Sequence, residues 1–245
     1  MSPRMARMNR FRLFAAALAA SSCLPSAAAE AAKAVAHREP NCIPLEDFRA
    51  SKPGEFPTNW RTKYEKQMKS AIEKKNIVIV DDDKHRGIRV KYDKETVTVV
   101  RKVEGWNLET HPILEWTWKA IKLPYGANEA DVTKNDAALG LYLVWEESFP
   151  MKISFLRFTW SSALPIGKII SRKFGFENIF VMDSGTEKLG TWQSHRVNAH
   201  DMTRQYIRKK DAKLESPALI ALTTDADASK SEAEGVYGEM KVCRE

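Results

Sequence analysis

The sequence has few cysteines, and none of them has the spacing of a metal site. Its 245 residues include only Cys23, Cys42 and Cys243, whereas paired zinc ligands are separated by roughly two to four residues. A glycine-rich phosphate loop and the strand–helix alternation of a nucleotide-binding sheet are also missing. No Gly-x-Ser-x-Gly stretch is present, which excludes the nucleophile elbow of the α/β-hydrolases.

A hydrophobic run long enough to cross a membrane is absent as well. The N-terminal run from Leu13 to Ala20 is much shorter than the roughly 20 residues that a spanning helix needs. It follows an arginine-rich start and precedes Ala27-Ala28-Ala29, which has the form of an export cleavage site. We therefore expect residues 1–29 to be a signal peptide and the mature protein to be periplasmic or secreted. The alternative is a lipoprotein anchored at Cys23, although the residues before it lack the usual large aliphatic side chain.

The N-terminal segment 1–29 contains no acidic residue. The formal net charge is +7, but four arginines in residues 1–29 contribute to it, and the remainder of the chain carries +3. Basic and acidic residues are interleaved there, and no aromatic-basic motif of a nucleic-acid-binding module occurs. We therefore expect no nucleic-acid partner, and the oligomeric state stays open.

The rest of the chain is rich in β-branched and aromatic residues with a period of two, which predicts about ten strands. They are Ile77–Val80, Gly87–Tyr92, Thr96–Arg101, Ile113–Ile121, Asp136–Glu146, Lys152–Trp160, Asn178–Met182, Thr191–Asn198, Pro217–Thr224 and Gly235–Val242, with a further short one at Leu45–Phe48. Thr62-Lys-Tyr-Glu65 has capping-box spacing and predicts an amphipathic helix that ends near Asn76; a second, short helix is expected over 201–210. The expected fold is mostly β: an antiparallel, jelly-roll-like β-sandwich that forms a single domain over 44–245, after a flexible leader over 30–43.

Cys42 and Cys243 remain once the signal peptide is removed. An even number of cysteines in an oxidising compartment predicts a disulfide between them. The alternative is a pair of free, buried thiols.

Several short motifs follow one another in a fixed order. They are Phe56-Pro-x-x-Trp60, Leu114-Glu-Trp-Thr-Trp118, Leu123-Pro124, Asn135-Asp-Ala-Ala-Leu-Gly-Leu-Tyr142, Phe158-Thr-Trp160, Ser184-Gly185, Leu189-Gly-x-Trp192, Arg196-Val-Asn198 with Asp201, and Thr224-Asp-Ala-Asp227. In this order of motifs the sequence resembles an uncharacterised family of exported bacterial proteins, known as a domain of unknown function. The resemblance implies an exported β-sandwich with no established activity. The chain departs from the family at Asn135, where an acid is usual, and at Leu139-Gly140.

Tryptophans lie on or beside many of the expected strands, at Trp60, Trp116, Trp118, Trp145, Trp160 and Trp192. Exposed indole rings on a sandwich stack against sugar rings, whereas indoles on an apolar strand face belong to the core. Trp116 and Trp118 share a face with Leu114 and Ala120, so we expect them inside. Trp192 lies between glycine and polar residues and is the expected stacking residue.

Charged residues suggest two further sites. We expect Asp136, Arg196 and Asp201 to form an ion-pair cluster, which either fixes the sandwich or holds a polar ligand together with Trp192. Asp225 and Asp227 have the spacing that begins a Ca²⁺ loop, but Lys230 replaces the glycine that such a loop requires. A turn capped by aspartate side chains, without any cofactor, is therefore preferred over Ca²⁺. If Arg196 lies beside this acidic turn, we expect it to neutralise the carboxylates.

These features favour a non-catalytic protein that binds a carbohydrate or a related polar ligand. The alternative is a glycoside hydrolase or lyase that uses two carboxylates, drawn from Asp136, Asp201, Asp225 and Asp227, across a cleft. His195 and His200 are five residues apart and do not share a strand face, so no catalytic residue is assigned. The spatial separation of the carboxylates decides between the two hypotheses.

Overall fold

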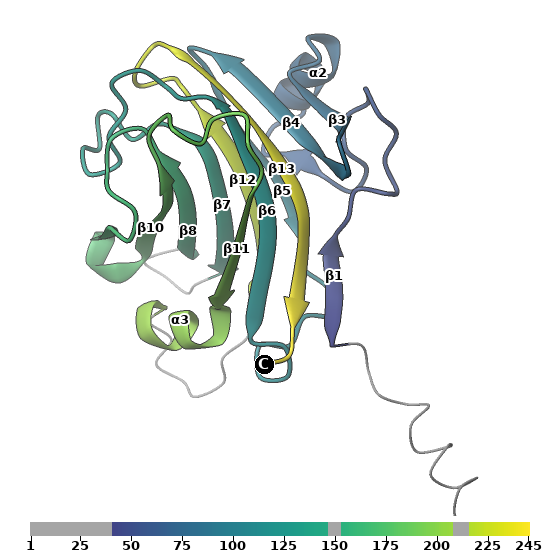
Figure 1. Cartoon of the computed structure of the whole chain (residues 1–245), viewed down its shortest axis with the longest axis vertical. Helices are drawn as coiled ribbons and strands as arrows, with labels where there is room; N and C mark the ends of the chain where they lie inside the picture. The colour runs from purple at the N-terminus through teal and green to yellow at the C-terminus, as the bar shows by residue number, and fades with distance from the viewer. Residues whose placement is uncertain (1–40, 147–152, 208–215) are drawn as a thin grey trace, which may run out of the picture. The chain divides into compact units, whose positions relative to one another are not determined.

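The computed structural model describes residues 41–146, 153–207 and 216–245, which form two β-sheets packed face to face (Figure 1). The expected signal peptide, Cys23, most of the expected leader and the end of the expected helix over 201–210 lie outside these residues. In the described part of the chain, no helix is both long and apolar enough to cross a membrane.

The six-stranded sheet has the order β11-β6-β13-β4-β3, and β1 also pairs with β13. All of its pairings are antiparallel. Its strands are β1 (Cys42–Glu46), β3 (Ile77–Asp82), β4 (His85–Asp93), β6 (Ile113–Lys122), β11 (Gln193–Asn198) and β13 (Glu232–Cys243).

The seven-stranded sheet has the order β2-β5-β12-β7-β8-β10-β9. Its pairings are antiparallel except that β8 and β10 run parallel. Its strands are β2 (Arg61–Thr62), β5 (Thr96–Lys102), β7 (Ala137–Glu146), β8 (Ile153–Ser161), β9 (Ile169–Arg172), β10 (Glu177–Ser184) and β12 (Leu219–Asp225). The predicted mostly β, jelly-roll-like sandwich is thus confirmed, and β2 and β9 are the strands that the sequence did not predict.

The core lies between the two sheets and contains most of the tryptophans. Trp116 and Trp118 of β6 are buried, while the alternating residues Glu115, Thr117 and Lys119 are partly exposed. This alternation is what a strand with one face on the core requires. The remaining buried indoles are those of Trp60, Trp106, Trp145 and Trp160.

Both predicted helices are present, but the first differs in detail. Helix α2 (Glu65–Glu73) follows Tyr64, which makes no side-chain cap, and Thr62 lies in β2 and donates its hydroxyl to the Tyr64 carbonyl. The predicted capping box is therefore wrong. Helix α3 (Ala199–Tyr206) is capped by Asn198, whose side chain accepts from the Asp201 amide. In Figure 1, α3 lies at one end of the sandwich and α2 lies beside β3 and β4.

The predicted disulfide joins Cys42 and Cys243. The two residues are register partners in the antiparallel pair of β1 and β13, with Cα atoms 4.0 Å apart. The bridge thus ties the first strand of the described fold to its last strand.

Candidate ligand-binding face

The outer surface of the seven-stranded sheet gathers polar residues from distant parts of the chain. In β7, Leu139, Leu141 and Leu143 belong to the core, so Gly140 and Tyr142 between them face outward. Because β12 and β8 are the neighbours of β7 in the sheet, their outward-facing side chains lie beside Gly140 and Tyr142. We call this outer surface of β5, β12, β7 and β8, with Asn135 at its end, the polar face.

Arg157 and Tyr142 are register partners at the centre of the polar face. The Arg157 guanidinium lies over the Tyr142 ring, 5.4 Å from its centroid, which is a cation–π distance. One terminal nitrogen of Arg157 donates to Oδ1 of Asn135 at 3.1 Å. Arg157 is only 2% exposed, and within the described residues its buried Nε has no hydrogen-bond partner. Tyr142 is partly exposed, and its ring contacts Arg157 on one face and Phe155 edge-on at a centroid distance of 5.2 Å.

Gly140 has no side chain, and this leaves room for the packed side chains of Tyr142 and Arg157. A Cβ atom at Gly140 would lie 3.0 Å from the Tyr142 ring and 3.4 Å from Nε of Arg157. The glycine is held from the core side, because its amide donates to the Tyr237 hydroxyl at 3.0 Å and that hydroxyl donates to the Thr223 carbonyl at 2.6 Å. The backbone beneath the polar face is thus fixed by a side chain of the other sheet.

Hydroxyl groups continue the polar face toward β5. The side chains of Thr98 and Thr223 are hydrogen-bonded at 2.8 Å, and the two residues are register partners in β5 and β12. Beyond them, Thr96 lines a hollow of about 540 Å³ together with Asp227 and residues of α2. Tyr92 and Val97 of the core also line this hollow, so it lies at the edge of the sandwich beside α2.

Three carboxylates meet where the polar face reaches the turn between β12 and β13. Oxygen atoms of Asp136, Asp225 and Asp227 lie within 4.8 Å of one another. The pKa of Asp225 is raised to about 7, mainly by burial and further by the negative charges of the neighbouring Asp136 and Asp227. We call these three residues the acidic cluster. Such a set can share a proton or hold a divalent cation, for which the same three residues would supply the oxygen ligands.

Asp136 caps this turn from a distant part of the chain. Its two carboxylate oxygens accept from the amides of Ala228 and Ser229, at 3.2 and 2.6 Å. Asp225 also accepts from the Asp227 amide, at 3.4 Å. These bonds are those of a turn capped by aspartate side chains.

The spacing of the acidic cluster bears on the glycosidase hypothesis. Retaining glycosidases place their two carboxylates about 5–5.5 Å apart, and inverting ones about 6.5–9.5 Å apart, to leave room for the sugar and water. In the acidic cluster, one oxygen atom of each carboxylate lies within 4.8 Å of the others. Asp201, the fourth carboxylate of that hypothesis, is exposed in the first turn of α3. Three of the four carboxylates of that hypothesis are thus gathered in the acidic cluster, and Asp201 is not among them.

Trp192 lies on the opposite sheet, away from the polar face. Its ring stacks on His85 at a centroid distance of 4.4 Å and lies 5.3 Å from the Lys119 ammonium. A Cβ on Gly238 of β13 would come within 2.9 Å of the indole, which shows how closely the ring lies on that strand. The ring of Trp192 is partly exposed, but His85 already occupies a stacking position against it.

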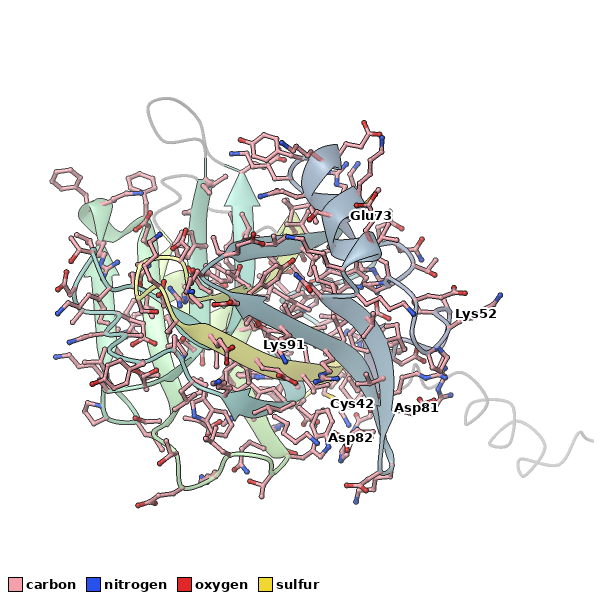
Figure 2. The ribbon with its side chains drawn as sticks, turned by 90° about the horizontal axis from the view of Figure 1, so that it is seen from above. Cys42, Lys52, Glu73, Asp81, Asp82 and Lys91 are labelled. Carbon is pink, nitrogen blue, oxygen red and sulfur yellow. A yellow bond between two sulfur atoms is a disulfide. The ribbon has the colours of Figure 1, made fainter. Side chains whose placement is uncertain are left out.

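Arg196 also lies on the six-stranded sheet, and its partner there is Glu115. Its Nε donates to Glu115 at 3.1 Å, and Lys241 approaches the same carboxylate at 3.3 Å. The described residues show no pairing of Arg196 with Asp136 or with the acidic turn. The expected cluster of Asp136, Arg196 and Asp201 is therefore divided among three places, because β11 is the edge strand of the other sheet. The outer surface of the six-stranded sheet carries charged side chains that are paired with one another. Figure 2 shows β3 and β4 of this sheet, with Asp82 and Lys91 labelled. Asp82 forms an ion pair with Lys119.

A buried polar network that the sequence did not reveal connects the two sheets. Oδ2 of Asp183 in β10 accepts from the Trp118 indole at 2.8 Å and lies 2.6 Å from Nε2 of His195 in β11. Lys188 is 3.7 Å from the other carboxylate oxygen. A β-bulge between Val181 and Asp183 changes the strand phase, which explains why simple alternation gave no sign of an inward aspartate.

The chain belongs to the family described as "Protein of unknown function (DUF3047)", whose model matches residues 58–241. No curated protein matches the chain. Among solved structures, a family 11 carbohydrate-binding module from Clostridium thermocellum, in complex with a β-1,3-1,4-mixed-linked tetrasaccharide, is 11% identical, with 84% of this chain and 98% of that chain covered and a TM-score of 0.42. The family 11 module of a cellulosomal cellulase from the same organism is 9% identical, with 85% of this chain and 97% of that chain covered and a TM-score of 0.42. The family 11 xylanase from Neocallimastix patriciarum is 9% identical, with 75% of this chain and 92% of that chain covered and a TM-score of 0.27. Similarities at this level carry no functional inference.

Proposed function

We propose that this DUF3047 protein is a non-catalytic β-sandwich that binds a carbohydrate on its polar face. The observation that carries the proposal is the pair of Tyr142 and Arg157. Tyr142 is partly exposed and lies beside a buried guanidinium whose Nε has no hydrogen-bond partner in the part of the chain that the structure describes. Sugars combine apolar ring faces with hydroxyl groups, so they match a site with one stacking ring and convergent polar groups.

The site is built on strands, which fix the backbone positions of its residues. Tyr142 and Arg157 come from adjacent central strands, and Asn135 immediately precedes β7. Tyr237 fixes the backbone of Gly140 beneath them. Preorganised polar groups lose less conformational entropy on binding than mobile ones do.

The residues predicted from the sequence take different parts in this proposal. Asp136 stays in it, because it shapes the turn at the end of the polar face. Trp192 and Arg196 lie on the other sheet, and Asp201 lies in the first turn of α3. We therefore assign ligand contact to Tyr142 and Arg157.

The proposed location is outside the cytoplasm, in the periplasm or the medium. The Cys42–Cys243 disulfide supports it, because disulfides persist mainly in oxidising compartments. The signal-like residues 1–29 support it independently. Extracytoplasmic proteins meet the polysaccharides that such a face would bind.

Isothermal titration against a panel of soluble polysaccharides, neutral and acidic, tests the proposal. We expect Tyr142→Ala to weaken binding at least tenfold, while Trp192→Ala serves as the matched aromatic control on the other sheet and leaves the affinity unchanged. Circular dichroism checks that both variants are folded. Loss of binding in Trp192→Ala alone, or no binding by the wild type to any member of the panel, would contradict the proposal.

A further inference from the structure

We propose that the ligand of the polar face is an acidic sugar, whose carboxylate pairs with the guanidinium of Arg157. This inference rests on the proposed function and names the class of its ligand. It would be a uronic-acid-type sugar, with a carboxylate attached to the sugar ring.

The first argument is the missing counterion of Arg157. A buried charge is stable only when it is paired or fully hydrogen-bonded. Within residues 41–146, 153–207 and 216–245, no carboxylate forms an ion pair with Arg157, and the only hydrogen bond it donates there is to the neutral Asn135. The most buried part of the side chain, Nε, is left without a partner.

Other arginines of this chain show the contrast. Five of them among the described residues, all more exposed than Arg157, pair with a carboxylate: Arg49 with Asp47, Arg86 with Asp81, Arg89 with Glu234, Arg101 with Glu46 and Arg196 with Glu115. These arginines thus have carboxylate partners although water can also reach them. Arg157, which has far less access to water, has no carboxylate partner among the same described residues.

The acidic cluster at the end of the polar face does not fill this role. Its members are bound to the turn amides and to one another. The raised pKa of Asp225 indicates that the net influence on this carboxylate is burial and negative charge rather than a nearby cation. The counterion of Arg157 is thus expected to come from the ligand.

The geometry of the free group selects a carboxylate. Guanidinium presents Nε and a terminal nitrogen as a planar fork that matches the two oxygens of a carboxylate. Asn135 accepts from Nη1, so within the described residues Nε and Nη2 remain as the fork. The ring of Tyr142 beside it supports the sugar ring to which the carboxylate is attached.

Matched pairs of oligosaccharides test the inference with the wild-type protein. The α-1,4-linked trimer of galacturonic acid is compared with its methyl ester and with maltotriose, and a mannuronic acid trimer is compared with β-1,4-mannotriose. We expect the acidic member of a pair to bind at least tenfold more tightly than the neutral one. Because the methyl ester differs from the free acid only at the carboxyl group, this comparison does not depend on the folding of any variant.

Variants then locate the effect. Arg157→Met should remove the preference for the acid, Arg157→Lys should keep only part of it because an ammonium lacks the fork, and Arg196→Met on the other sheet should keep all of it. If Arg157→Met does not fold, the Nε–H signal of Arg157 in ¹⁵N-labelled wild type must shift with the acid and not with its ester. Equal binding of acid and ester, or a preference that survives in folded Arg157→Met, overturns this inference and leaves carbohydrate binding intact. Failure of every oligosaccharide and polysaccharide to bind overturns both.

Discussion

Nε2 of His195 lies 2.6 Å from Oδ2 of Asp183, and this contact joins β11 of one sheet to β10 of the other. The same oxygen accepts the indole N–H of Trp118. A carboxylate that is almost fully buried and holds two donors from the opposite sheet fixes how the sheets pack at this edge.

Asp183→Ala should therefore destabilise the fold strongly. It leaves the buried Trp118 N–H and the His195 imidazole without their acceptor, and each stranded group costs about 1–3 kcal/mol. Urea unfolding measures the change. Arg196→Ala is the control and should cost about 1 kcal/mol or less, because its ion pair with Glu115 is exposed and Lys241 remains. A smaller effect of Asp183→Ala than of Arg196→Ala would refute this role.

Asp225 should make stability depend on pH. Its pKa is about 7 in the folded protein and about 3.9 in an unfolded chain. The folded state therefore binds more protons between these values, so the contribution of Asp225 to stability is present at low pH and is lost as the pH rises toward 7. The slope is at most about 1.4 kcal/mol per pH unit.

Replacing Asp225 with asparagine isolates this contribution from those of other carboxylates. We expect Asp225→Asn to be more stable than the wild type at pH 8, and the difference to shrink as the pH falls to about 4. Urea unfolding at a series of pH values provides both curves. Parallel curves for the two proteins would show that Asp225 does not titrate in this range.

The acidic cluster should hold a proton rather than calcium at pH 6. A protonated Asp225 lowers the negative charge of the cluster, and Asp136 is already engaged by two amides. Thermal melts in EDTA and in millimolar CaCl₂ should therefore coincide, since a ligand of the native state raises its stability by RT ln(1 + [L]/Kd). A rise with calcium that disappears in Asp227→Ala would establish a metal site instead.

The disulfide should be a major source of stability. It closes a loop with a sequence separation of 201 residues, for which chain entropy predicts a large contribution, and loss of such bridges typically costs about 2–5 kcal/mol. The Cys42→Ser, Cys243→Ser double variant should show this loss in urea. Peptide mapping without reductant checks the bridge, and recovery of both thiols free in the exported protein would contradict it.

Alternation along the chain predicted most of the fold because each long strand has one face on the core. The pattern around Trp116 and Trp118 indicated both the strand and its buried side, and both are confirmed. β9 was missed because Ile169–Arg172 is short and its apolar residues are adjacent rather than alternating. The capping box failed because Thr62 is committed to β2.

The candidate site was harder to predict because it depends on strand order. Tyr142 and Arg157 are 15 positions apart in the sequence, and only the pairing of β7 with β8 makes them neighbours. The sequence placed Trp192 and Arg196 in one site with Asp136, but β11 is a strand of the other sheet. Sequence periodicity gives the face of a strand, whereas long-range pairing decides which strands share that face.

Hydrogen–deuterium exchange of the wild-type protein, with and without a bound oligosaccharide, tests the central claim most directly. Binding on the polar face predicts slower exchange in residues 135–142, 155–159 and 221–227, with little change in residues 191–196. Protection confined to residues 191–196 and the neighbouring strands of the six-stranded sheet would place the ligand on the opposite side of the sandwich and contradict the account.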